Sequence, residues 1–226
     1  DAKLIIITAG IARKPGQTRL DLAKTNVSIV KGITENIMKY ADNPLILVVS
    51  NPADITTMAI QEVSGLPANR VIGSGTSLDT ARLRHILSST LHVNVEDVNA
   101  YVLGAHGDSQ VPIWSSANIG GFNLDDYASQ VGVTLNKEEI AARTKDGGAE
   151  VIGLKGATFY GIAMAVSNIV ETIMKDDDAL LPVAHVLGEE FGDWAGIAVS
   201  MVCRIGWGGV EQTMRIHMSE EEKEKM

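Results

Sequence analysis

The chain has 226 residues, 45% of them hydrophobic, and a formal net charge of −9 at pH 7. This length and apolar content suffice for a packed core, so we expect a globular protein of one large or two small domains. The acidic balance argues against nucleic acid and anionic membrane surfaces as partners, because both require clustered Lys and Arg. The single cysteine, Cys203, cannot form an internal disulfide; we expect it in the core, and we expect no metal site.

The sequence shows neither a membrane span nor a signal peptide. It contains no run of about eighteen uncharged apolar residues, and its first residues lack the basic region and cleavage site of a secretory signal. We therefore expect a cytoplasmic protein without a membrane partner.

Both ends of the sequence carry patterns that are incomplete. Residues 3–10 have the pattern of a buried parallel strand, yet no strand precedes them to pair with. Residues 219–222 form a capping box, which begins a helix, and only 223–226 follow. We therefore expect a fragment that lacks an N-terminal part and the rest of a C-terminal helix.

The first half has the pattern of a parallel α/β unit. After the opening strand, apolar residues at helical spacing predict a helix over 19–40, and buried strands are predicted at 45–49 and 71–73. A helix over 54–63 separates these two strands. The alternation of strand and helix is typical of a right-handed parallel sheet.

From residue 74 the pattern changes to α+β without a flexible linker, so the expected domains are 1–73 and 74–226. The helices predicted in this second half cover 78–91, the start of 136–147, and 148–174. Apolar runs predict an antiparallel sheet of three strands at 180–187, 196–205 and 210–218.

His106 is the first candidate for chemistry. It lies between two glycines directly after the strand-like residues 100–103, and side chains at strand ends commonly meet the substrate in α/β folds. A polar turn with a solvated histidine would give the same local pattern. The choice between the two therefore depends on the rest of the chain.

Four more residues have chemically useful side chains but also ordinary explanations. Arg19 could be a solvated residue of a first helical turn, and Asn51 could be a turn residue. Asp79 and Arg82 could form an exposed helical ion pair, which contributes only about 0.2 to 0.5 kcal/mol. Together with His106, however, these residues lie within a recognisable series of motifs.

Five segments resemble, in order, motifs of the lactate and malate dehydrogenase family: TAG (8–10), RKPGQTRLDL (13–22), SNP (50–52), IGSGTSLDTAR (72–82) and GAHGDS (104–109). The resemblance covers essentially the whole chain. It implies that residues 1–73 are the C-terminal part of a Rossmann-type NAD-binding domain and that 74–226 are the substrate domain. It also implies an oxidoreductase that moves a hydride between a small 2-hydroxy acid and NAD.

The resemblance assigns catalytic and substrate-binding roles to five side chains. His106 would be the general acid and base, and Asp79 would hold its other ring nitrogen. Arg82 would bind the substrate carboxylate through two parallel hydrogen bonds. Arg19 would polarise the ketone from a loop that closes over the substrate, and Thr158 would line the substrate pocket.

The cofactor residues that the resemblance implies lie at the ends of predicted strands. They are Thr8, Ala9, Gly10, Val49, Asn51 and Ser74, and Asn51 would contact either the carboxamide or the substrate hydroxyl. The sequence contains no Gly-x-Gly-x-x-Gly, so we expect the pyrophosphate loop in the missing N-terminal part. The chain alone is therefore expected to bind NAD poorly.

Arg13 bears on the substrate, because the residue before Lys-Pro-Gly sets specificity in this family. Lactate dehydrogenases generally carry glutamine there, whereas malate dehydrogenases carry an arginine that pairs with the second carboxylate of oxaloacetate. Beside pyruvate an unpaired Arg13 would carry a desolvation cost. The other motifs resemble bacterial lactate dehydrogenases of fermentation, so we favour lactate and pyruvate, with malate and oxaloacetate as the alternative.

The resemblance also implies a homo-oligomer, a tetramer by analogy with the family. Some bacterial members are activated by fructose 1,6-bisphosphate through an arginine and a histidine, which correspond to Arg84 and Asn99 here. Asn99 cannot become cationic, so we do not expect this activation. Ala105 stands where glutamate commonly precedes the histidine, which removes one carboxylate near His106.

Three other functions fit parts of the sequence. NAD-dependent glycosidases share the fold but need a Cys and His metal site, and Cys203 lies in a late apolar run. A serine hydrolase built from His106, Asp108 and Ser109 would require three neighbours on one turn to align. A non-catalytic assembly role would leave the joint presence of the candidate side chains unexplained.

Overall fold

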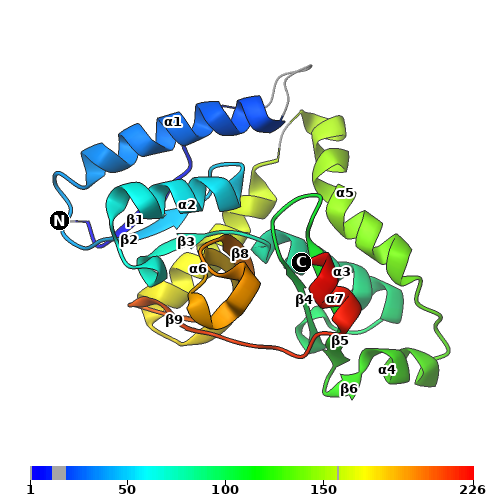
Figure 1. The fold of residues 1–226 in the computed structure, drawn as a ribbon. Helices are drawn as coiled ribbons and strands as arrows, with labels where there is room; N and C mark the ends of the chain where they lie inside the picture. The colour runs from blue at the N-terminus through cyan, green and yellow to red at the C-terminus, as the bar shows by residue number, and fades with distance from the viewer. Residues whose placement is uncertain (1, 12–18, 157) are drawn as a thin grey trace.

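The computed structural model describes residues 2–11, 19–156 and 158–226, with 19–21 described by their backbone only. Within these residues the centre of the molecule is one six-stranded sheet (Figure 1). Its strands, in spatial order, are β1 (Leu4–Ile7), β2 (Leu45–Val48), β3 (Val71–Gly73), β7 (Ala179–Val186), β8 (Ala198–Gly206) and β9 (Gly209–Thr213). The first three are parallel, and each later strand is antiparallel to its neighbour.

A second, antiparallel sheet lies beside the first (Figure 1). Its strands are β4 (Val98–Leu103), β5 (Val111–Ile119) and β6 (Phe122–Asn123). The α-helices are α1 (Arg19–Ile37), α2 (Ala53–Ser64), α3 (Ser77–Leu91), α4 (Leu124–Gln130), α5 (Lys137–Lys155), α6 (Tyr160–Lys175) and α7 (Glu220–Lys225). The short 3-10 helices are η1 (Ala68–Arg70), η2 (Val95–Asp97) and η3 (Glu189–Trp194). No helix in the described part of the chain has the length and hydrophobicity that a membrane crossing requires.

Helices cover both faces of the six-stranded sheet because β2 is apolar on both sides. Ile46 and Val48 belong to a core cluster that α1 and α2 complete, whereas Leu45 and Leu47 belong to a cluster that α6 completes. Successive side chains of a strand point to opposite faces, so an uninterrupted apolar strand must be buried twice. At the edge strand β1 burial is only partial, and Ile6 is 42% exposed.

The two sheets are joined near Ser200 of β8. The backbone of Ser200 exchanges two hydrogen bonds of 3.0 Å with Gly104, directly after β4, and its hydroxyl oxygen accepts a hydrogen bond from the Thr76 N–H at 3.0 Å. Thr76 precedes α3, and its own hydroxyl donates to the Val102 carbonyl of β4. The end of β4 and the beginning of α3 are therefore fixed to the same strand.

The expected helix over 148–174 is wrong. The structure has two helices instead, because α5 continues through this segment to Lys155 and ends at Gly156, which has a φ of +81°. A positive φ is readily adopted only by glycine, and the Gly156 N–H closes α5 by donating to the Ile152 carbonyl. The chain then turns, and α6 begins at Tyr160.

The other expected elements are confirmed with changes at their ends and in their pairing. The helix predicted over 19–40 ends at Ile37, and the last predicted strand ends at Thr213 instead of Met218. The three late strands do pair antiparallel, but they extend the parallel sheet through the Gly73–Ala184 contact and do not form a separate sheet. The sequence did not predict β5, β6 or α4. Cys203 is fully buried in the core, as expected.

The C-terminal helix α7 forms as its capping box predicts and is tied to β5 by Glu222. This carboxylate accepts hydrogen bonds from the Trp114 N–H at 2.7 Å, the Ser115 N–H at 3.1 Å and the Ser115 hydroxyl, and the Ser219 N–H at 2.8 Å completes the box. Burial raises the pKa of Glu222, but these donors outweigh it and hold the pKa below the ordinary value of 4.5.

Glu222→Gln should lower the free energy of unfolding at neutral pH by about 1 to 3 kcal/mol, because several donors lose a charged acceptor. Since the folded-state pKa of Glu222 is depressed, its contribution is present above about 4.5 and is lost as the pH falls through the folded-state value. The difference in free energy of unfolding between wild type and Glu222→Gln should therefore become smaller at acidic pH. Urea unfolding at several pH values measures it, with the exposed Glu221→Gln as control; an equal loss in both variants would contradict the prediction.

Candidate active site

His106 lies on a turn that follows β4 and is held at both ends. Gly104 begins the turn with a φ of +84° and is bonded to Ser200, and Gly107 has a φ of +115°. Both values lie in the region that glycine adopts without strain. The backbone of the turn therefore favours glycine two residues before His106 and directly after it, which explains Gly104 and Gly107 in the sequence.

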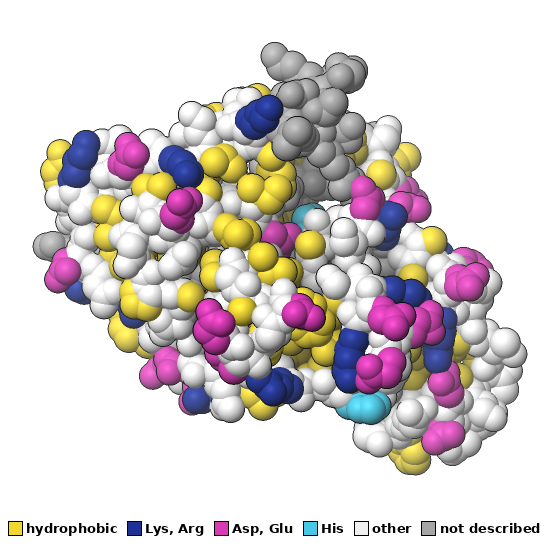
Figure 2. Space-filling view, in the orientation of Figure 1, with side chains coloured by type: hydrophobic (Ala, Val, Ile, Leu, Met, Phe, Trp, Pro, Cys, Tyr) yellow, Lys and Arg dark blue, Asp and Glu magenta, His cyan; other side chains and the backbone are white. Residues whose placement is uncertain are grey.

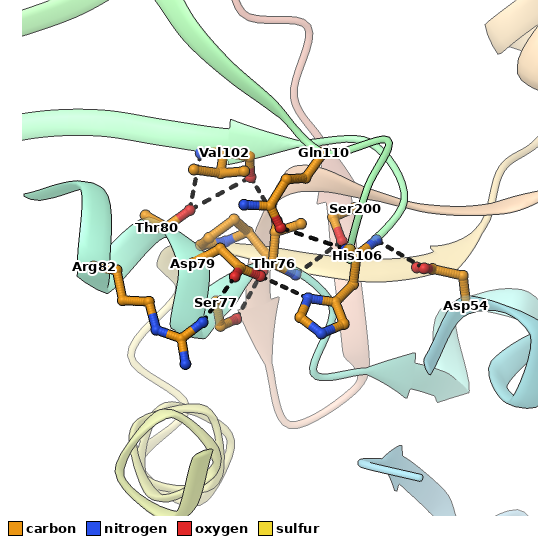
Figure 3. Close-up of polar contacts among 12 residues, drawn as sticks. Asp54, Thr76, Ser77, Asp79, Thr80, Arg82, Val102, His106, Gln110 and Ser200 are labelled. Carbon is orange, nitrogen blue, oxygen red and sulfur yellow. Dashed lines mark hydrogen bonds and ion pairs between the residues drawn. The ribbon is translucent and has the colours of Figure 1, made fainter. Parts of the chain in front are cut away.

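Asp79 orients the His106 ring, as the resemblance implies. It belongs to the first turn of α3, its side chain is 1% exposed, and its Oδ2 lies 2.7 Å from His106 Nδ1. The hydrogen bond from this carboxylate raises the pKa of His106 above 6.5; burial opposes the shift, and the charges of Asp79 and Asp54 add to it. The imidazolium is therefore more stable than that of a free histidine, and Figure 3 shows the second ring nitrogen turned away from Asp79.

Arg82 lies one helical turn after Asp79 and shares its carboxylate. Its Nη1 is 3.2 Å from Asp79 Oδ1, and its side chain is 21% exposed. The guanidinium lies against the glycine pair Gly147 and Gly148 of α5, where a Cβ on Gly147 would come within 3.3 Å of Arg82 Cδ and Nε. The glycines therefore leave the room that this planar cation occupies.

The expected cofactor residues gather at one edge of the parallel strands. Thr8 to Gly10 follow β1, Val49 and Asn51 follow β2, and Ser74 follows β3. These carboxyl ends meet at the same edge, where α/β folds commonly bind their ligands. Thr8 and Asn51 are exposed there, whereas Ser74 is 3% exposed.

Two buried polar side chains hold this edge together. The Ser50 hydroxyl donates to the Ala9 carbonyl at 2.6 Å. Asn26 of α1 accepts from the Ile11 N–H at 2.8 Å and donates to the Asn51 carbonyl at 2.7 Å. The segments that follow β1 and β2 are therefore linked through their backbones.

For three predicted site residues the structure gives less information about their position in the site. Arg13 lies outside the described residues, and Arg19 is the first residue of α1, with a side chain that is also outside them. Thr158 is half-buried in the connection between α5 and α6. Gly161 of α6 packs close to Leu78, beside Asp79, so this connection leads toward the beginning of α3.

The sequence-based reasoning missed Asp54 and Asn26. Asp54, in the first turn of α2, accepts a hydrogen bond from the His106 N–H at 2.9 Å. Both residues have the sequence pattern of ordinary helical polar residues, and only their distant partners distinguish them. The one local signal was the position of Asp54 soon after the Ser-Asn-Pro motif.

The surface around the site is mixed in charge. Figure 2 shows Lys and Arg side chains interspersed with acidic ones on one face, and a hollow in which a histidine and an acidic side chain are visible. A cavity of about 680 Å³ is lined by residues that follow His106 in sequence, such as Asp108, Gln110 and Trp114, together with part of α7. Since its described lining includes neither His106 nor Arg82, it is not the site of the candidate chemistry.

This geometry can transfer a proton next to a bound anion. An oriented imidazolium can donate to a carbonyl oxygen, and the guanidinium beside it can pair with a carboxylate. Comparison with known proteins matches residues 1–73 to the NAD binding domain of lactate/malate dehydrogenases and residues 76–226 to their alpha/beta C-terminal domain. The chain belongs to the lactate/malate dehydrogenase family.

Members of this family that resemble the chain include bacterial L-lactate dehydrogenases. The chain is 39% identical to that of Clostridium perfringens strain SM101 and 42% identical to that of Macrococcus caseolyticus, over all of its own length and 72% and 71% of theirs. Among solved structures, a lactate dehydrogenase from a Medee basin deep-sea metagenome matches with a TM-score of 0.95 at 36% identity, covering all of this chain and 72% of that one. The Clostridium thermocellum L-lactate dehydrogenase matches with a TM-score of 0.88 at 43% identity, covering 99% and 72%.

Asp79→Asn should lower the pKa of His106, because the main cause that raises it is the hydrogen bond and charge of this carboxylate. A titration of the histidine ring signals by NMR measures the change. Asp97→Asn, which removes an exposed carboxylate from η2, is the matched control. A His106 pKa that stays the same in Asp79→Asn would contradict the assignment.

Proposed function

We propose that this protein catalyses the NAD-dependent interconversion of L-lactate and pyruvate. The observation that carries the proposal is the cluster in which Asp79 contacts both His106 Nδ1 at 2.7 Å and Arg82 Nη1 at 3.2 Å. A 2-keto acid has a carboxylate next to a carbonyl, so it requires a cation and a proton donor side by side. The names of the related enzymes support the same substrate pair.

In the direction of pyruvate reduction, His106 donates the proton from its second ring nitrogen to the carbonyl oxygen. Asp79 keeps the ring in the required orientation and stabilises the imidazolium before the transfer. In lactate oxidation the neutral imidazole takes the hydroxyl proton back. The direction of reaction is therefore linked to the protonation state of one side chain.

Arg82 binds the substrate carboxylate. Its planar guanidinium offers two parallel N–H donors, which matches the geometry of a carboxylate better than a lysine does. Arg19 polarises the substrate carbonyl, and Thr158, before α6, lines the substrate pocket. Arg13 acts at the far end of the substrate.

The residues at the carboxyl edge of β1, β2 and β3 fit the nicotinamide half of NAD. Thr8, Ala9 and Gly10 would lie along it, Val49 and Asn51 would contact it from β2, and Ser74 from β3. The fit rests on exposed polar groups at a strand edge that Ser50 and Asn26 hold together. When bound, the cofactor would supply the hydride for pyruvate reduction in its reduced form, NADH, and would accept it from lactate in its oxidised form.

We also propose the setting in which the protein works. It acts in the cytoplasm in fermentative glycolysis, with residues 1–73 serving NAD and 74–226 serving the substrate. It assembles as a homo-oligomer, a tetramer by analogy with the family. Exposed apolar side chains at the junction of α5 and α6 support assembly: Leu154, Phe159 and Met164 are 82%, 62% and 71% exposed.

The substrate is tested by NADH oxidation in the complete gene product that contains these residues. We expect pyruvate to be reduced faster than oxaloacetate, and Arg13→Gln to widen that preference because it removes a cation suited to a second carboxylate. A preference for oxaloacetate that Arg13→Gln abolishes would favour malate dehydrogenase instead. No activity with either acid would contradict the proposed function.

Arg82→Lys should raise the KM for pyruvate on the order of a hundredfold, because losing the bidentate contact costs about 3 kcal/mol. Steady-state kinetics with saturating NADH measure it. Arg84→Lys is the matched control, since Arg84 is on the same helix but donates to the Ala100 carbonyl at 2.9 Å. An unchanged KM in Arg82→Lys would remove Arg82 from carboxylate binding.

A further inference from the structure

Asp54 connects the catalytic turn to the NAD-binding part of the chain. It lies in the first turn of α2, just after Asn51 at the end of β2, and its Oδ2 accepts a hydrogen bond from the His106 N–H at 2.9 Å. This contact joins segments 52 residues apart in sequence. Figure 3 shows the two carboxylates of the site, Asp54 and Asp79, on different sides of His106.

The surroundings of Asp54 disfavour a charged carboxylate whose only function is to accept one hydrogen bond. Its Oδ1 is buried without a hydrogen-bond partner among the described residues, and leaving a carboxylate oxygen unsatisfied costs stability. Burial raises the pKa of Asp54 to about 6, while the His106 N–H and the charge of His106 act in the opposite direction. An asparagine would supply the same acceptor without a charge that is hard to bury, so the charge itself calls for an explanation.

The charged groups that act on His106 come from two helices. Asp79 and Arg82 are on α3, and Asp54 is on α2; the two aspartates raise the pKa of the imidazole, and Arg82 lowers it. The charged groups that act on Asp54 are His106, which lowers its pKa, and Asp79, which raises it. Ala105, on the turn itself, contributes no charge. Asp54 is therefore a second anion whose charge stabilises the imidazolium, from the side of the His106 backbone N–H.

We propose that Asp54 is a positioning residue that anchors the His106 turn to α2 through its acceptor oxygen and, through its charge, favours the imidazolium that donates the proton. The two functions use one carboxylate but are separable by mutation. The inference rests on the proposed function of His106 as acid and base.

The charge has a directional consequence. Ionised Asp54 extends the imidazolium of His106 to higher pH, which favours pyruvate reduction and disfavours lactate oxidation at the same pH. When Asp54 is protonated or neutralised, the imidazole loses this support and deprotonates at lower pH. An anchor without an electrostatic function would change the rates of both directions but not their dependence on pH.

The test compares Asp54→Asn, which keeps an acceptor oxygen and removes the charge, with Asp54→Ala, which removes both. In the complete gene product, Asp54→Asn should move the midpoints of the pH profiles for pyruvate reduction and lactate oxidation to lower pH, each by about half a unit or more. Its maximal rates should stay within about threefold of wild type. Asp54→Ala should show the same displacement and lose on the order of tenfold or more in kcat, because the turn is no longer fixed.

Glu62→Gln is the matched control, because it removes an exposed carboxylate from the same helix that pairs with Lys31 at 3.4 Å. It should leave both midpoints where they are. The inference is overturned if Asp54→Asn leaves the midpoints unchanged, or if Glu62→Gln moves them equally. Equal maximal rates in Asp54→Asn and Asp54→Ala would overturn the anchoring part.

An NMR titration of His106 separates this inference from the proposed function, since it requires no turnover. Asp54→Asn should lower the His106 pKa even if neither pyruvate nor oxaloacetate is a substrate. If the wild type is inactive but Asp54→Asn still lowers the His106 pKa, the proposed reaction is contradicted and the electrostatic coupling of Asp54 to His106 is retained. If the variants do not fold, the same NMR titration of the wild-type protein tests the inference. Its His106 signals should show a second inflection at the pH where the Asp54 carboxyl carbon titrates, and a single inflection would overturn the inference.

Discussion

The site depends on one buried anion. Asp79 has a side chain that is 1% exposed, and a carboxylate removed from water is stable only with charged or hydrogen-bonded partners. Among the described residues it has two, the His106 ring and the Arg82 guanidinium, whose side chains are 30% and 21% exposed. The buried charge therefore orients two groups whose free sides face outward. A proton donor and an anion-binding cation come to lie side by side because they share one partner.

The rest of the fold holds the two elements that carry these groups. Asp79 and Arg82 belong to the beginning of α3, and His106 to the turn after β4. Both elements are tied to Ser200 of β8, through its hydroxyl oxygen and its backbone respectively. Because β8 belongs to the same sheet as the parallel strands, the His106 turn also has a fixed position relative to the strand ends where we propose that the nicotinamide binds. One continuous sheet thus connects the His106 turn to the carboxyl ends of β1, β2 and β3.

Polar side chains with distant partners complete this arrangement. Asn26 links the segment after β1 to Asn51, and Asp54 links α2 to the backbone of His106. The Asn26 contacts lie within the part of the chain matched to the NAD binding domain and hold one of its edges together. The Asp54 contact connects that part to the part matched to the C-terminal domain. Each of these hydrogen bonds makes a modest net contribution to stability. Their larger effect is on geometry, because they remove the freedom of loops that carry functional groups.

The sequence by itself determined the family, the reaction class, and most helices and strands, since hydrophobic periodicity, glycine turns and capping residues act over short distances. It also predicted that His106, Asp79 and Arg82 act together, and the structure brings these three side chains into contact. It misjudged the break at Gly156, where a helical pattern continues on both sides of the glycine, and it treated the late strands as a separate sheet. Strand pairing between Gly73 and Ala184, the anchoring of Gly104 on Ser200, and the approach of Asp54 to His106 were decided only by tertiary structure. These contacts join residues 52 to 111 positions apart, and no local pattern contains the free energy that selects one such pairing over another.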